Sequence, residues 1–212
     1  PQEVAEGFSR VFTGHAPVRA AEVGTKPHPK PTRLRVITEE MDVTQGKLVI
    51  GLHTGILGTE PDYPALTLLN AVLGSVMTSK LFVNVREKRS LCYYASSAVE
   101  RYKGIMRISS GIEFDKYETA KNAIFHELDE CRQGNITEAE LESARRGVVS
   151  ALRSALDVPA RLDDYYLGNA VAGGDRVETL LEKISALTKD DLVRAAQRIT
   201  PDTVYFLKGA QA

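Results

Sequence analysis

Two side chains that can donate hydrogen bonds, Arg86 and Tyr93, lie seven residues apart near the centre of the chain. A guanidinium and a phenol both donate hydrogen bonds to carbonyl oxygens, including an oxygen that gains negative charge during a reaction. Residues 78–89 have the apolar spacing of a short helix, and residues 92–99 are rich in residues that favour strands. The sequence therefore predicts Arg86 at a helix end and Tyr93 early in the following strand.

These two residues also have a plain structural interpretation. Arg86 is then an exposed cation at the negative end of a helix, and Tyr93 is a half-buried aromatic side chain of a strand. Successive strand residues point to opposite faces, so the pattern leaves open whether Tyr93 or its neighbour Tyr94 faces the solvent side of the sheet.

No other motif in the chain predicts catalysis, a metal ligand set or a cofactor. His126 opens the segment HELDE, but a helical HExxH site needs a second histidine at position 130, which is glutamate, and the inverted HxxEH order fails as well. No serine lies in a GxSxG turn, and no glycine-rich phosphate loop occurs. Cys92 has no neighbouring histidine that would lower its pKa, so we expect an ordinary thiol. The sequence predicts no catalytic residue, no metal site and no cofactor in this chain.

Composition excludes two classes of partner. Among 212 residues, 27 basic and 28 acidic side chains nearly cancel, so neither nucleic acid nor an anionic membrane surface is expected as a partner. No apolar run approaches the ~20 residues that span a bilayer. Two cysteines, Cys92 and Cys131, make no disulfide framework, and we expect a reducing, cytoplasmic location.

The predicted elements indicate an N-terminal extension and one α+β domain. Residues 1–31 comprise a short helix over 2–12 and a proline-rich connector, and residues 32–209 form the domain. Strands over 33–39 and 46–54 are predicted as antiparallel neighbours, the first of them half-exposed. The remaining elements are predicted as helices at 61–76, 115–132, 137–156, 159–172, 175–186 and 188–198, and strands at 92–99, 105–112 and 203–208. Antiparallel strands with helices packed on one face make a two-layer sandwich.

The run from Ser79 to Tyr93, S-K-L-F-x-x-V-R-E-K-x-x-L-x-Y, resembles the second-domain signature of the pitrilysin-type zinc metallopeptidases. This insulinase family includes insulin-degrading enzyme and the mitochondrial processing peptidase. The resemblance extends over about 32–209, because the LHTG strand, Gly74 and the helix pair broken near Pro159 also match.

The resemblance implies a role for each half of a larger protein. Members of the family fold as paired α+β domains that close around an unfolded peptide, and the first domain binds zinc through HxxEH and a later Glu. The second domain binds no metal and contributes an Arg and a Tyr, seven residues apart, that hold the substrate backbone; these match Arg86 and Tyr93. Since this chain has no HxxEH, it resembles the non-catalytic half, and zinc is expected only in a partner domain.

Two functions remain open from the sequence. The chain is either the substrate-binding half of a zinc metallopeptidase or a catalytically inactive, peptidase-like scaffold or partner subunit. Cys92 and the doubled Tyr93-Tyr94 also resemble bacterial homologues that lack the zinc motif. The expected partners are a peptide or unfolded protein, an N-terminal peptidase-like domain or homologous subunit, and a second copy in a homodimer.

Overall fold

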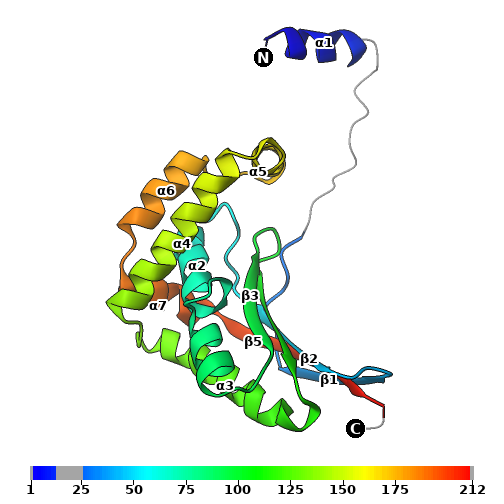
Figure 1. Cartoon of the computed structure of the whole chain (residues 1–212). Coiled ribbons are helices and arrows are strands. Elements are labelled where there is room, and N and C mark those ends of the chain that lie inside the picture. The colour runs from blue at the N-terminus through cyan, green and yellow to red at the C-terminus, as the bar shows by residue number, and fades with distance from the viewer. Residues whose placement is uncertain (1, 13–25, 211–212) are drawn as a thin grey trace.

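The computed structural model describes residues 2–12 and 26–210 (Figure 1). The helix predicted at the start of the chain is confirmed as α1 (Gln2–Phe12), whose apolar side chains Val4, Phe8 and Val11 are exposed. The predicted connector lies largely outside the described residues, as does His15. None of the described helices is long and apolar enough to cross a bilayer.

The domain is built on one mixed sheet of five strands in the order β1-β5-β2-β4-β3. Only the β1–β5 pair is parallel; the other three pairs are antiparallel. The predicted α+β class with helices on one face is confirmed, and the parallel pair is the departure from a purely antiparallel sheet (Figure 1). The strands are β1 (Arg35–Met41), β2 (Gly46–His53), β3 (Tyr94–Glu100), β4 (Ile105–Ile112) and β5 (Thr200–Gly209).

The prediction that the first two strands are neighbours is wrong, because β5 lies between them. β1 and β2 do run in opposite directions, but the short link over 42–45 crosses the end of β5, where the Ala210 amide donates to the Met41 carbonyl at 3.0 Å. Two strand spacings amount to roughly 10 Å, which four extended residues can span. No local pattern reveals that a strand some 150 residues later along the chain will enter this gap.

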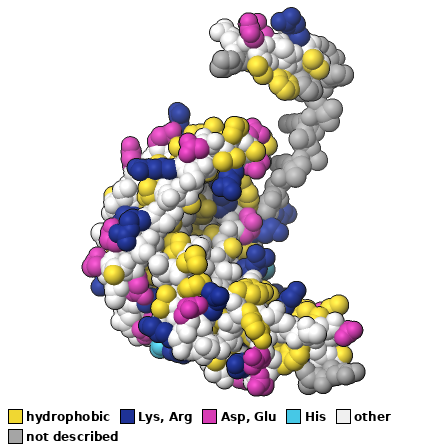
Figure 2. All heavy atoms as spheres, in the orientation of Figure 1, with side chains coloured by type: hydrophobic (Ala, Val, Ile, Leu, Met, Phe, Trp, Pro, Cys, Tyr) yellow, Lys and Arg dark blue, Asp and Glu magenta, His cyan; other side chains and the backbone are white. Residues whose placement is uncertain are grey.

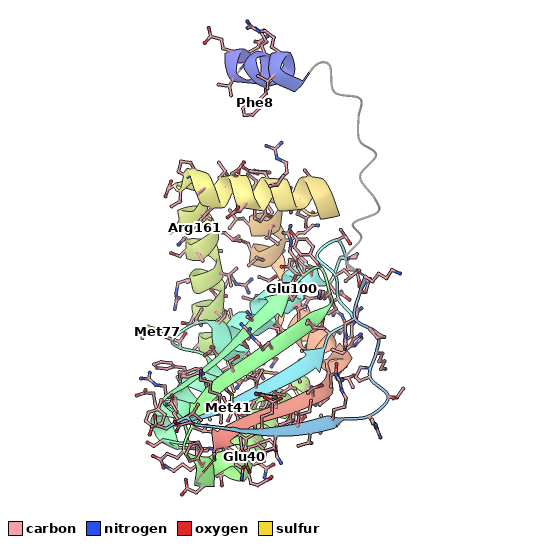
Figure 3. All side chains as sticks on the ribbon, turned by 90° about the vertical axis from the view of Figure 1, so that its right-hand side faces the viewer. Phe8, Glu40, Met41, Met77, Glu100 and Arg161 are labelled. Carbon is pink, nitrogen blue, oxygen red and sulfur yellow. The ribbon has the colours of Figure 1, made fainter. Side chains whose placement is uncertain are left out.

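β1 is also more exposed than predicted. Its alternating pattern indicated one buried face, yet all seven residues are exposed. β1 forms an edge of the sheet, and its one neighbouring strand is β5. The helices do not cover β1 (Figure 1). Figure 3 looks onto the open face of the sheet, where Glu40 and Met41 lie along this lower edge.

The helices pack against the opposite face of the sheet and enclose the core between the two layers (Figure 1). Leu48, Ile50 and Ile108 of the sheet are buried there against Leu69 and Ile124 of the helices. On the side shown in Figure 2, charged side chains of both signs are interspersed over the helical layer. The helices are α2 (Tyr63–Asn70), α3 (Tyr117–Arg132), α4 (Glu138–Leu156), α5 (Pro159–Ala172), α6 (Val177–Ala186) and α7 (Lys189–Arg198).

Helix termini explain why most helix boundaries were predictable. Thr137 accepts a hydrogen bond from the Glu140 amide while the Glu140 side chain accepts from the Thr137 amide, and Thr188 and Asp191 form a second such capping box. Gly134 follows α3 with φ of 78°, a conformation that glycine adopts without steric cost. By contrast, two segments predicted as helix take the wider π geometry, η1 (Ala71–Ser75) and η2 (Leu81–Lys88). Residue propensities do not distinguish π from α turns.

His28 attaches the segment before β1 to the rest of the domain. Its amide donates to the Lys103 carbonyl at 2.9 Å, and its ring Nε2 lies 2.5 Å from the Asp202 carboxylate. The His53 ring in turn donates from Nε2 to the His28 carbonyl at 3.1 Å. The sequence contained no local signal for this attachment, because its three partners come from three distant segments.

Candidate functional site

A reversal of the chain between η2 and β3 brings Arg86 and Tyr93 together. η2 carries Arg86 in its last turn, as predicted, and Ser90 then adopts a left-handed φ of 49°. The Leu91 amide donates back to the Val85 carbonyl at 3.1 Å, so the chain returns along the helix end. Among the described residues Ser90 is the only non-glycine residue with positive φ, a conformation that costs about 1–2 kcal/mol for an L-residue.

The Arg86 guanidinium has three contacts. Nε donates to the main-chain carbonyl of Tyr93 at 2.9 Å, Nη1 pairs with Glu87 at 3.2 Å, and the group lies 4.7 Å from the centre of the Phe82 ring. Its second terminal nitrogen, Nη2, has no hydrogen-bond partner in residues 2–12 and 26–210. The side chain as a whole is 38% exposed.

Tyr93 is held by its backbone, whereas its side chain is left open. Its amide donates to the Gly111 carbonyl at 2.8 Å, and its carbonyl accepts from Arg86. The side chain is 57% exposed, and the hydroxyl makes no hydrogen bond within the described part of the chain. Tyr93 lies just before β3, at the rim of the sheet, with its main chain fixed and its polar end unoccupied.

Tyr94 differs from Tyr93 in both position and packing. As the first residue of β3 it is paired with Gly111, and it points to the open face, while Ala95 points to the helices. Its ring lies over Gly111, where a Cβ atom would come within 2.5 Å of Cε1 of Tyr94. Ser110 also donates to the Tyr94 carbonyl at 2.9 Å. Of the two tyrosines considered from the sequence, the structure places Tyr93, and not Tyr94, next to Arg86.

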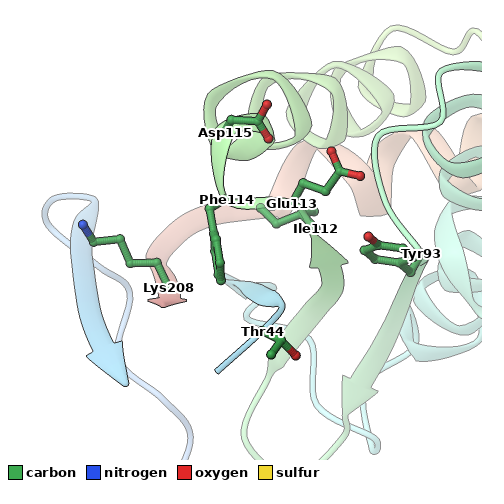
Figure 4. A pocket seen from close by; sticks show the side chains of 7 residues that line it. All are labelled: Thr44, Tyr93, Ile112, Glu113, Phe114, Asp115 and Lys208. Carbon is green, nitrogen blue, oxygen red and sulfur yellow. The ribbon is translucent and has the colours of Figure 1, made fainter. Parts of the chain in front are cut away.

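Two hollows meet at Tyr93. The smaller, of about 380 Å³, lies on the Arg86 side, and the larger, of about 650 Å³, lies on the Phe114 side (Figure 4). Tyr93 and Glu113 line both of them. The smaller hollow is further lined by Arg86, Glu87, Ser90, Leu91, Cys92 and Lys116, and the larger by Thr44, Ile112, Phe114, Asp115 and Lys208.

The charges around Arg86 nearly cancel, and the pKa of the nearby Cys92 thiol is raised. Arg86 pairs with Glu87, and Lys116 pairs with Glu113 at 3.0 Å. Burial raises the pKa of Cys92, although a hydrogen bond to Ser110 and the charge of Arg86 act in the opposite direction. The site can donate hydrogen bonds to a bound chain, but it presents no activated thiolate.

The described residues contain no ligand set that fits zinc. No three His, Cys, Asp or Glu side chains among them are grouped closely enough to hold a metal ion. His126 lies on the exposed side of α3, in keeping with the interpretation of HELDE as an ordinary helical segment. A catalytic zinc site needs about three protein ligands, and the described residues bring no such set together.

Comparison with known proteins identifies relatives over most of the chain. The profile of the Peptidase M16 inactive domain matches residues 5–148, more than half of the chain. A Bacillus subtilis (strain 168) protein named probable inactive metalloprotease YmfF is 37% identical over 176 residues, which cover 82% of this chain and 41% of that protein.

Solved structures agree with this match. A conserved protein from Enterococcus faecalis V583 is similar over 100% of this chain and 50% of its own, with a TM-score of 0.87 and 29% identity. A protease from Helicobacter pylori covers 98% of this chain and 52% of its own, with a TM-score of 0.85 and 22% identity, which shows the shared fold. The chain thus spans about half the length of each of these three proteins.

Proposed function

The chain belongs to the Peptidase M16 inactive domain family, and from this membership we propose that it is the substrate-binding, non-catalytic half of a pitrilysin-type zinc metallopeptidase. The observation that carries the proposal is the pair Arg86 and Tyr93. The Arg86 guanidinium lies beside the Tyr93 main chain, and neither Nη2 of Arg86 nor the Tyr93 hydroxyl has a hydrogen-bond partner in the described residues. Both groups donate hydrogen bonds, and both open onto the hollows at Tyr93.

An extended peptide is the ligand that suits these donors. Every residue of an extended chain presents a carbonyl oxygen, and Nη2 of Arg86 and the Tyr93 hydroxyl donate to such oxygens. Because Glu87 and Glu113 balance the charges of Arg86 and Lys116, the site favours neutral main-chain groups over a strongly charged ligand. Recognition through the backbone fits a protein that binds peptides of varied sequence.

Cleavage of the peptide requires a second component in this proposal. An N-terminal peptidase-like domain or a homologous subunit would hold the zinc that activates a water molecule, and this chain would position the substrate. The proposed setting is the cytoplasm of a bacterium, and a second copy of the chain is a further proposed partner. Several relatives are named uncharacterized zinc proteases, among them YmxG of Bacillus subtilis (strain 168).

A catalytically inactive scaffold or partner subunit is the second candidate function. The name of YmfF, probable inactive metalloprotease, favours it. In that case the domain binds a protein partner and the parent protein cleaves nothing.

The proposed function is tested by peptide affinity with Tyr93→Phe and, as the matched control, Tyr94→Phe. The probe is a fluorescently labelled, unfolded peptide of mixed sequence titrated with the chain. We expect Tyr93→Phe to weaken binding by roughly 2- to 10-fold, because this change in affinity corresponds to the loss of one neutral hydrogen bond. Tyr94→Phe should bind like the unaltered chain. Failure of the unaltered chain to bind the peptide, or equal losses in the two variants, contradicts the proposal and favours the scaffold.

A further inference from the structure

The larger hollow beside Tyr93 has the features of a side-chain pocket. We propose that it receives one large apolar side chain, leucine-like or phenylalanine-like, of the peptide that Arg86 and Tyr93 hold. The inference rests on the proposed function and adds a sequence preference to it.

Continuity between the two hollows is the first argument. Tyr93 and Glu113 line both, so a chain bound to the Arg86 side passes directly into the mouth of the larger hollow. At about 650 Å³, the larger hollow falls within the roughly 300–1,000 Å³ of small-ligand pockets, and it is wider than a main chain alone requires.

The walls of the larger hollow are mostly apolar. Ile112 is buried, and the half-buried Phe114 ring lies between the side chains of Lys208 and Tyr93 (Figure 4). The aliphatic stem of Lys208 extends along the opposite side (Figure 4). An apolar side chain between two aromatic rings loses its contact with water, which is the main source of affinity in such pockets.

Phe114 is held in place before any ligand binds. Its ring lies over two glycines: a Cβ atom at Gly46 would lie 3.2 Å from Cδ1 of Phe114, and one at Gly209 would lie 3.0 Å from Cζ. Because the Phe114 ring is already packed in one position, it loses little conformational entropy when a ligand binds. Ordering of this side chain therefore takes little from the binding free energy.

The charges at the rim select against acidic side chains. Lys208 pairs with Glu40 at 2.8 Å, and Glu113 pairs with Lys116 at 3.0 Å. Asp115 is exposed and has no ion pair in the described part of the chain, so the rim carries a net negative charge. An aspartate of the peptide is repelled by this rim, whereas leucine or phenylalanine is not.

The experiment uses a series of peptides that differ at one central position, which is Phe, Leu, Ala or Asp. We expect the Phe and Leu peptides to bind roughly tenfold more tightly than the Ala peptide, and the Asp peptide to bind weakest. Since Phe114→Ala also removes packing on Gly46 and Gly209, the pocket is instead filled by Thr44→Trp at its exposed edge. Thr44→Trp should abolish the preference, and Ser150→Trp, an exposed site on α4, should retain it.

Each outcome decides the inference. Equal affinity for all four peptides, or a preference that survives Thr44→Trp, overturns the pocket while leaving peptide binding by Arg86 and Tyr93 intact. Absence of binding to every peptide overturns the proposed function, and the pocket with it.

Discussion

Arg86 and Tyr93 are joined through the main chain of the tyrosine: Nε of Arg86 donates to the Tyr93 carbonyl at 2.9 Å. This bond fixes the relative position of the two residues without using the Tyr93 hydroxyl. No hydrogen bond joins the guanidinium to the Tyr93 hydroxyl in the described part of the chain. The bond runs instead from the guanidinium to the backbone, so neither Nη2 of Arg86 nor the Tyr93 hydroxyl takes part in it.

Ser90 is expected to be a strained residue whose replacement by glycine stabilises the domain. Its φ of 49° is costly for serine and free for glycine, so Ser90→Gly should raise the free energy of unfolding by about 0.5–1 kcal/mol. Ser90→Val should lower it, because a β-branched residue tolerates this conformation least. Urea unfolding of the three proteins measures both changes, and a Ser90→Gly protein that is less stable than the unaltered chain contradicts the account.

Both cysteines are expected to be slow to react. Burial raises the pKa of Cys131 to about 12 and also raises that of Cys92, so little thiolate exists near neutral pH. A coloured thiol reagent at pH 7.5 should modify the folded chain much more slowly than the urea-unfolded chain. Cys92→Ser isolates the contribution of Cys131. A Cys92 thiol that reacts as fast as free cysteine would contradict the environment described for it.

Acid sensitivity is expected to depend on the buried ion pair between Lys80 and Glu140, whose atoms Nζ and Oε1 are 2.9 Å apart. Burial raises the pKa of Glu140, but hydrogen bonds from the Thr137 amide and from Lys80 outweigh it, so the pKa lies below its ordinary value. A carboxylate with a lowered pKa in the folded state contributes stability above its unfolded pKa of about 4.3, and this contribution is lost as the pH falls through the folded value.

Replacement of Lys80 by methionine should therefore flatten the pH dependence of stability. With the cation gone, the folded pKa of Glu140 moves toward its unfolded value, and less stability is lost between about pH 5 and pH 3. The measurement is the free energy of unfolding in urea across this range, with Lys30→Met as a control at an exposed lysine. An identical pH slope in Lys80→Met and the unaltered chain would show that the pair does not set acid sensitivity.

The purified chain is expected to bind no stoichiometric zinc and to cleave no peptide. A catalytic zinc needs about three protein ligands, usually two histidines and a glutamate at fixed spacing, and the sequence has no HxxEH. Elemental analysis of the purified chain gives the zinc content, and a peptide digest followed by mass spectrometry gives the activity. One zinc per chain together with chelator-sensitive cleavage refutes this prediction.

Local signals explain the parts of the fold that the sequence predicted well. The capping box at Thr137 and Glu140 marks the start of α4, and β4 has the predicted bounds Ile105–Ile112. The position of β5 between β1 and β2 depends on contacts between distant segments, and so does the attachment of His28. A short stretch of sequence contains no signal for such contacts.

The candidate site was predictable to the same degree. Arg86 and Tyr93 lie on either side of one turn, so their spacing alone predicts that they approach each other. The larger hollow could not be predicted, because Thr44, Phe114 and Lys208 meet only after three separate segments reach one end of the sheet. The sequence indicated the pair that we propose holds a peptide backbone, and the structure adds the hollow that we propose for a side chain.

The central claim is that Arg86 serves a ligand rather than the fold. The most direct test is Arg86→Ala, with urea unfolding and peptide affinity measured on the same preparations. We predict that affinity for an unfolded peptide falls tenfold or more, since a charge-assisted hydrogen bond contributes about 1.5–3 kcal/mol. The free energy of unfolding should fall by no more than about 1 kcal/mol, because the side chain is exposed and makes one backbone hydrogen bond. An Arg86→Ala chain that unfolds much more easily while binding the peptide as before would show a structural residue and contradict the account.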